Sequence, residues 1–424
     1  MSRKLLLVAV LILVMVISAC QAPVAAPGVQ GPAGPQGPAG PAGADGAAGE
    51  PGPAGPAGPA GAAAEGEATA AVFGSEYVGA ETCATCHTEV AEVFNMSGHP
   101  FKLNPVVDGQ PPEYPFTELS ELPEGYTWDD ISYVIGGYNW KARFMNQDGF
   151  IITDAPGETG NADYLNQYNY ANPVVGNEAG WVTYHSGEEN KPYDCGTCHT
   201  TGYRPEGNQD DLPGIVGTWS EPGIHCEECH GPGSLHADNP YGVAMQVDRD
   251  SEQCGSCHFR GVPETIDASG GFIKHHEQYE ELFQSKHVTI DCVVCHDPHT
   301  GVIQLRKAGE QTTRTTCENC HFDNVEDQNS EVHKAVEVQC IDCHMPRVTK
   351  SAVGNAEMFT GDLRTHLMAI DPNQIGQFNE DGTVALSQLG LNFACRHCHV
   401  EGGSATPKTD AELSERAADY HVIQ

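Results

Sequence analysis

The feature that most constrains this chain is the motif Cys-x-x-Cys-His, which occurs eight times. This is the pattern in which two thiols bond covalently to the vinyl groups of a haem and the histidine ligates its iron. The cysteines of the motifs are Cys83, Cys86, Cys195, Cys198, Cys226, Cys229, Cys254, Cys257, Cys292, Cys295, Cys317, Cys320, Cys340, Cys343, Cys395 and Cys398. The predicted proximal iron ligands are His87, His199, His230, His258, His296, His321, His344 and His399.

Cysteine pairs at this spacing also build zinc sites. A zinc site joins two half-sites, however, and gives no reason for a histidine after every second cysteine. The chain has 17 cysteines, so the motifs leave only Cys20 and no thiols for a disulfide framework. The predicted cofactor is therefore eight haem c groups, each with its iron.

Composition indicates that these haems fill much of the core. The chain contains 48 glycines and 29 prolines, and only 7% of its residues are aromatic. Eight flat apolar groups bury more hydrophobic area than so few large side chains can. The predicted fold class is mainly α with extensive coil and a small β-hairpin, a multihaem cytochrome c built around eight covalently bound haems.

Local patterns predict a few elements. Residues 140–153 alternate around an Asp-Gly turn and predict a hairpin. Residues 275–287 show helical spacing, and a capping box from Thr409 to Glu412 opens a helix that runs to about His421. Short helices are expected at the motifs, joined by coils.

The charge balance limits the partners. The chain has 58 acidic and 21 basic side chains, a formal charge of −37. Nucleic acid and anionic membrane surfaces repel such a chain, so no nucleic-acid partner is expected. The expected partners are redox proteins or an external electron acceptor.

The N-terminus reads as an export signal. Arg3 and Lys4 precede a short apolar run, and the small residues before Cys20 resemble a bacterial lipobox. We therefore expect a lipoprotein signal peptide at 1–19, lipidation of Cys20 and an anchor at 20–27. This places the chain outside the cytoplasm, attached through its lipid to the outer face of a cell membrane or to an outer membrane.

A collagen-like Gly-x-y tract follows at residues 28–61, then a linker at 62–74 and one octahaem domain at 75–424. Gly at every third position is what a triple helix needs, because only Gly fits at its axis. A single extended chain is the alternative. At about 3.1 Å per residue, either form makes a stalk of about 100 Å.

Function depends on the second axial ligand of each iron, because an iron with an open face can react with a substrate. Three histidines close to a proximal one serve neighbouring haems or none: His225, His236 and His299. His397, inside a motif, is taken as structural. The predicted distal ligands are His99, His236, His287, His299, His333, His366 and His421. His287 is expected to end the helix of 275–287, and His366 is expected on the buried face of another helix.

The eighth distal position stays open. His185, His275 and His276 compete for it, or one haem is five-coordinate. Met96 and Met358 are alternative ligands, whereas Met345 is too close to His344 to reach the far face of that iron.

The runs "CEECHGPGSLH", "CVVCHDPH", "CIDCHMP" and "YVIGGYNWKARFM" resemble the multihaem cytochrome family related to cytochrome c-554, hydroxylamine oxidoreductase and pentahaem nitrite reductase. The resemblance covers residues 79–398. It implies a mainly α-helical fold with haems in parallel and perpendicular pairs, and distal roles for His236, His287, His299 and His333. No motif ends in lysine, as the catalytic motif of the nitrite reductases does. Tyr203, Tyr279 and Tyr420 are present, but nothing in the sequence marks one as the crosslinked tyrosine of the hydroxylamine enzymes.

Two functions follow. The first is an exported, membrane-tethered electron carrier between membrane redox carriers and an external acceptor. The alternative is an oxidoreductase of a small nitrogen or sulfur compound at one open-faced haem, with Lys141, Arg143 and His185 as its nearest candidates. A third role, adhesion through the stalk with haem as filler, explains the eight motifs least well.

The tract gives a testable prediction. If it forms a triple helix, the full chain sediments as a homotrimer and a variant lacking residues 28–61 sediments as a monomer. Equal monomer masses would rule out the trimer and leave the single-chain spacer.

Overall fold

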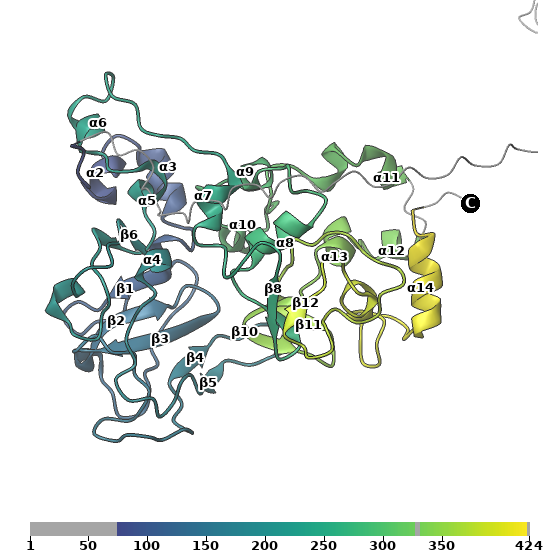
Figure 1. Cartoon of the computed structure of the whole chain (residues 1–424), viewed down its shortest axis with the longest axis horizontal. Coiled ribbons are helices and arrows are strands. Elements are labelled where there is room, and N and C mark those ends of the chain that lie inside the picture. Colours follow the sequence, from purple (N-terminus) through teal and green to yellow (C-terminus); the bar gives the residue numbers. More distant parts are fainter. Residues whose placement is uncertain (1–73, 327–330, 422–424) are drawn as a thin grey trace, which may run out of the picture. The chain divides into compact units, whose positions relative to one another are not determined.

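The computed structural model describes residues 74–326 and 331–421 (Figure 1). The predicted signal peptide, the lipidation site Cys20, the Gly-x-y tract and linker residues 62–73 lie outside these residues. The described residues belong to one unit, Gly66–Gln424. Within them, no helix combines the length and the apolar character that a membrane span requires.

Short helical turns form at the motifs, as predicted. In several motifs the histidine N–H bonds the carbonyl of the first cysteine, for example His87 to Cys83 at 2.9 Å and His296 to Cys292 at 2.8 Å. This turn sets both thiols and the imidazole on one side of the backbone. The elements are α2 (Ala80–Ala84), α4 (Gly196–His199), α5 (Cys226–His230), α7 (Ser251–Gly255), α9 (Cys292–Cys295), η4 (Cys317–Asn319), α13 (Cys340–His344) and the π-helical turn η5 (Asn392–Arg396).

The first sheet is antiparallel, with strands in the order β1-β2-β3-β4-β5. Its strands are β1 (Leu103–Pro105), β2 (Ile131–Gly136), β3 (Lys141–Asn146), β4 (Gln167–Asn169) and β5 (Gly180–Val182). The hairpin predicted at 140–153 is present only in part. Its turn forms, but the second run makes a single bridge, Met145 to Ile151, and β3 pairs mainly with β2.

A second sheet has the order β11-β10-β9-β8-β12. It comprises β8 (Ile266–Ser269), β9 (Phe272–Lys274), β10 (Thr349–Asn355), β11 (Thr360–Leu363) and β12 (Val384–Ala385), and a small ribbon pairs β6 (Thr200–Thr201) with β7 (Glu221–Pro222). The strand content therefore exceeds the predicted small hairpin. Its strands are short. β8 and β9, and β10 and β11, pair as neighbours in the sequence, whereas β9 pairs with β10 in parallel across a long stretch of chain, which local alternation does not reveal.

Two predicted helices differ in detail. The helix expected at 275–287 is α8 (Gln278–Gln284), which ends before His287. The final helix is α14 (Asp410–Ala418), and its capping box is confirmed: the Thr409 N–H donates to Glu412 Oε2 at 2.8 Å. No helix forms around His366, which follows β11 in a loop. The remaining helices are α3 (Thr88–Phe94), α6 (Ser234–Asp238), α10 (Val302–Ala308), α11 (Phe322–Glu326), α12 (Glu331–Ala335), η1 (Pro100–Lys102), η2 (Trp128–Asp130) and η3 (Gln209–Asp211).

Buried carboxylates connect the coil segments. On α8 the fully buried side chains are Glu280 and Glu281, whereas Phe283 is 44% exposed. Glu280 accepts the backbone N–H groups of Arg260 and Gly261, and Glu281 accepts the Thr349 hydroxyl at 3.1 Å. A buried carboxylate is stable where such donors replace its water.

Glu227 is the strongest of these connections. It is 1% exposed and lies between the two cysteines of its motif. Its carboxylate accepts backbone N–H groups from Val78 at 3.0 Å, Gly79 at 2.8 Å and Gly233 at 2.7 Å. It therefore fixes the start of the described chain to α5.

We predict that Glu227→Gln lowers the free energy of unfolding by about 2 kcal/mol, because a neutral amide offers one acceptor and loses the charge-assisted bonds. Urea unfolding of the haem-loaded protein, followed by the Soret band, measures this. The exposed Glu89 serves as the matched position. Equal stability of Glu227→Gln and Glu89→Gln would contradict the prediction.

Candidate haem ligands and an open cationic site

The fold brings each predicted distal histidine close to a proximal one from another part of the chain. Seven ring pairs have centre separations between 5.8 and 6.4 Å. The pairs are His87–His236, His258–His99, His230–His299, His321–His287, His296–His366, His399–His333 and His344–His421.

This separation fits a haem iron between the rings. A ligating imidazole nitrogen lies about 2 Å from a first-row metal, so two rings on opposite sides of one metal have centres about 6 Å apart. Rings in direct stacking contact lie closer, as His275 and His276 do at 4.2 Å. The haem groups that the motifs imply therefore fit the residues present.

The hydrogen bonds of the imidazoles agree with this arrangement. Nδ1 donates to a backbone carbonyl in His230 (Gln246, 2.8 Å), His236 (Val243, 2.6 Å), His344 (Met368, 2.7 Å) and His399 (Thr406, 2.8 Å). Such an outer bond fixes the ring and leaves Nε2 as the ligating atom.

His258 has two histidine rings near it, His99 at 6.4 Å and His276 at 6.1 Å. Its Nδ1 bonds Gln278 Oε1 at 3.1 Å. Both separations fit an iron between the rings, so His99 keeps its predicted role and His276 is an alternative partner of His258.

The motifs lie beside one another in a defined order. Cys340 Sγ is 3.6 Å from Glu318 Oε1, and the Cys292 N–H bonds the Ser251 hydroxyl at 3.1 Å. Gln253 bonds the Cys229 carbonyl at 2.6 Å, and α2 packs on α5 as α13 packs on η5. With the interaction of Cys295 and Cys317, these contacts connect the motifs in the order His87, His230, His258, His296, His321, His344, His399.

The His199 motif lies outside this line, beside the His258 motif. Cys198 Sγ is 4.0 Å from the Ser256 carbonyl, and Cys257 Sγ is 3.9 Å from the Thr197 carbonyl. Among the described residues, which include all 20 histidines of the chain, none pairs with His199 at the separation seen elsewhere. Its Nδ1 is buried without a hydrogen-bond partner in the described structure.

Basic side chains gather around His199 instead. Burial lowers the pKa of His199 to about 3, and the positive charges of Lys102, Arg143 and Lys141 lower it further. Lys141 and Arg143 lie on one face of β3, while Ala142 and Phe144 on the other face are fully buried in apolar core. The strand therefore presents cations to one side and core to the other.

The two β3 cations are held differently. Arg143 Nε donates to Gln167 Oε1 at 2.6 Å, and its guanidinium lies 3.3 Å from the centre of the Tyr184 ring. Lys141 donates to the Ser351 carbonyl. Burial, and then the charge of Arg143, lower the pKa of Lys141 to about 7.

The three histidines that compete for the eighth distal position lie in different surroundings. His185 is exposed and bonds Glu188 Oε1 at 2.9 Å, so it does not reach this site. His275 and His276 are half-buried, and the pKa of each is lowered by burial first and also by His199. Lys102 also acts on His199, and no sequence pattern marked it, because it is an isolated lysine in a three-residue turn.

The two remaining histidines, His225 and His397, have other roles. His225 Nε2 bonds the Pro222 carbonyl at 3.0 Å, and His397 Nδ1 bonds the Phe393 carbonyl at 2.7 Å. Both bonds hold local backbone, in agreement with the structural role expected for His397.

Comparisons with known proteins add the family. The model of the family "Cytochrome c554 and c-prime" matches residues 169–231, which contain the His199 and His230 motifs. Octaheme sulfite reductase MccA of Wolinella succinogenes has a similar structure, with a TM-score of 0.53 and 17% identity over 81% of this chain and 70% of that one. No sequence among curated proteins matches the chain.

Two further structures are similar at lower scores. Outer cell wall cytochrome OcwA has a TM-score of 0.48 and 19% identity over 81% of this chain and 86% of that one. The undecaheme cytochrome from the S-layer of Carboxydothermus ferrireducens has a TM-score of 0.39 and 18% identity over 65% and 51%. The family match thus covers two of the eight motifs, and the fold is shared with an octahaem protein, MccA.

Proposed function

We propose that this protein is an exported octahaem cytochrome that passes electrons to an open-faced haem at His199, where a small nitrogen or sulfur oxyanion is reduced. One observation carries the proposal: His199 has no histidine partner in the described structure, and Lys102, Lys141 and Arg143 lie near enough for their charges to lower its pKa. The other proximal histidines each have one at 5.8–6.4 Å.

The seven histidine pairs would hold haems with both axial positions filled. Such haems exchange electrons without binding substrate. The contacts between motifs support a line of electron transfer from the His87 motif to the His399 motif, with the His199 motif beside the His258 motif. The haem at His199 would supply the redox-active iron for the reaction.

The side chains around His199 suit an anion. Arg143 is fixed through Nε and Tyr184, and its terminal nitrogens make no hydrogen bond within the described part of the chain. Lys102 is likewise without a hydrogen bond or ion pair to a described residue. Charged donors that need no rearrangement bind and orient an oxyanion in a buried site.

The reaction also needs protons. Removing one oxygen from an oxyanion takes two electrons and two protons and releases one water. The line of haems held by the seven histidine pairs would supply the electrons. Lys141 can supply a proton because its pKa lies at about 7.

Export and tethering rest on the sequence. The signal peptide at 1–19, lipidation of Cys20 and the stalk at 28–61 would hold the haem domain away from its membrane. Reduced membrane carriers or redox proteins would be the electron donors.

Electron transfer to an external acceptor is the second candidate function. The observation in its favour is that Cys86, Cys317 and Cys320 are exposed, so haems bound there would have edges near the surface. Electrons could leave at these motifs rather than at His199.

We predict that low-temperature EPR of the ferric protein shows a high-spin signal from one haem in eight, because the iron at His199 has one open face. Eight low-spin signals would exclude the reaction at His199 and leave the electron-carrier function.

A matched pair of histidine variants controls this experiment. His236→Ala removes the partner of His87 and should add a second high-spin signal, whereas His225→Ala should leave the spectrum unchanged. An unchanged spectrum in His236→Ala would contradict the ligand pair.

We also predict pH-dependent anion binding at His199. Lys141 is a base with a pKa of about 7, so its positive charge is present below that pH and is lost above it. Azide, anionic across pH 6–8, should therefore bind the high-spin haem more weakly as the pH rises.

The measurement is an azide titration of the Soret band. Lys141→Gln should weaken azide binding about tenfold at pH 6, the loss of one charge-assisted contact, and should remove most of the dependence on pH. Lys408→Gln, which alters an exposed cation just before α14, is the control. Wild-type pH dependence in Lys141→Gln would show that another group is responsible.

A further inference from the structure

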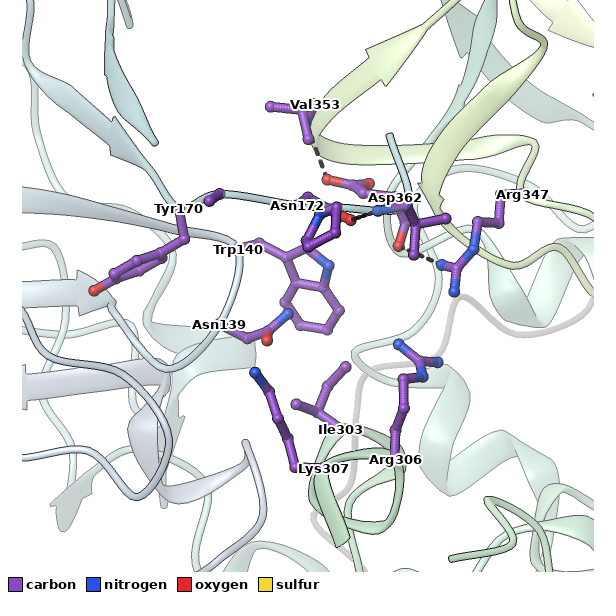
Figure 2. A pocket seen from close by; sticks show the side chains of 13 residues that line it. Asn139, Trp140, Tyr170, Asn172, Ile303, Arg306, Lys307, Arg347, Val353 and Asp362 are labelled. Carbon is purple, nitrogen blue, oxygen red and sulfur yellow. Dashed lines mark hydrogen bonds between the residues drawn. The ribbon is translucent and has the colours of Figure 1, made fainter. Parts of the chain in front are cut away.

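A second cationic site lies away from His199, in a cavity of about 150 Å³. Side chains from the first sheet, from α10 and from the second sheet line it (Figure 2). Figure 2 shows Ile303, Arg306 and Lys307 extending from α10 toward Trp140, with Arg347 on the side of the second sheet.

The charge of the lining is opposite to that of the chain. The protein has a formal charge of −37, yet Arg306, Lys307 and Arg347 face this cavity with Asp362 as the acidic residue of the lining. Arg306 and Arg347 come from distant parts of the sequence. Burial, and then the charges of Arg364 and Arg306, lower the pKa of Arg347 to about 10. Their mutual repulsion needs a compensating charge.

Asp362 acts on Arg347 through its charge but forms no ion pair with it. Its carboxylate accepts the backbone N–H groups of Ser351 at 2.6 Å, Ala352 at 2.7 Å and Val353 at 3.0 Å. Arg347 donates to the backbone carbonyl of Asp362, at 3.0 Å, and not to its carboxylate. Arg306 has no hydrogen bond or ion pair with any residue that the structure describes.

The size and chemistry of the cavity define what it can hold. Its volume equals that of about five water molecules, enough for a group with a few oxygen atoms. Guanidinium groups donate two parallel hydrogen bonds to a carboxylate or an oxyanion, and an indole ring provides a flat apolar wall.

We propose that this cavity binds an anionic oxygen group, with Arg306 and Arg347 as donors and Trp140 as its wall. Two sources share this chemistry: a free divalent oxyanion such as sulfate, and a propionate of a neighbouring haem. Binding of either group does not depend on the reaction at His199. A negative result for this cavity would therefore leave the proposed function unaffected, and the reverse also holds.

Calorimetric titration of the haem-loaded protein with sulfate tests the first source. Sulfate should bind, Arg306→Gln and Arg347→Gln should each weaken it tenfold or more, and Arg306→Lys should fall between, because it keeps the charge and loses the paired donors. Arg249→Gln, which removes an exposed cation elsewhere, is the matched control. Arg143→Gln should leave the sulfate affinity of the cavity unchanged.

A redox titration tests the second source. If a propionate occupies the cavity, sulfate does not bind, and Arg306→Gln shifts one haem to a lower reduction potential because a compensating positive charge is lost. Folding of each variant is checked by its Soret spectrum. Absence of sulfate binding together with unchanged potentials in both arginine variants would overturn the proposal.

Discussion

The separation of about 6 Å between paired histidine rings is the constraint on which the rest of this fold depends. Each pair joins distant parts of the chain, as His87 and His236 or His99 and His258 do. The space between the rings matches an iron with two axial ligands. Apolar side chains form cores at the two sheets. Between the histidine pairs, haem would take that place, and the pairs would fix where each haem lies.

Carboxylates provide a second set of connections and help to explain the acidic composition. Glu227 and Glu280 each accept two or more backbone N–H groups from segments outside helices and strands, and Asp362 accepts them from the irregular part of β10. In most domains helices and sheets satisfy those donors. Here short elements leave many of them free, and buried acidic side chains take over. Part of the negative charge of the chain therefore stabilises the fold. The two cationic sites described above, at His199 and beside Trp140, contrast with it.

The sequence anticipated what local chemistry determines. The helical turns at the motifs and the cap at Thr409 follow from contacts within four residues. The set of candidate distal ligands was small, because few histidines were left after the proximal ones. The parallel pairing of β9 with β10 was missed because it joins distant stretches of the chain. The loop at His366 and the buried glutamates of α8 were also missed, because their partners are distant. Lys102 reaches His199 only through the tertiary fold.

The position of the His199 motif beside the line of motifs, rather than at its end, has a consequence for multi-electron chemistry. A haem at the end of a line receives one electron at a time, and each further electron must first be supplied by the electron donor. A site beside a line of haems can draw from both directions on charge that is already stored. The seven further motifs imply haems that would store several electrons. The reaction proposed at His199 would use these stored electrons to complete a multi-electron reduction before a partly reduced intermediate dissociates.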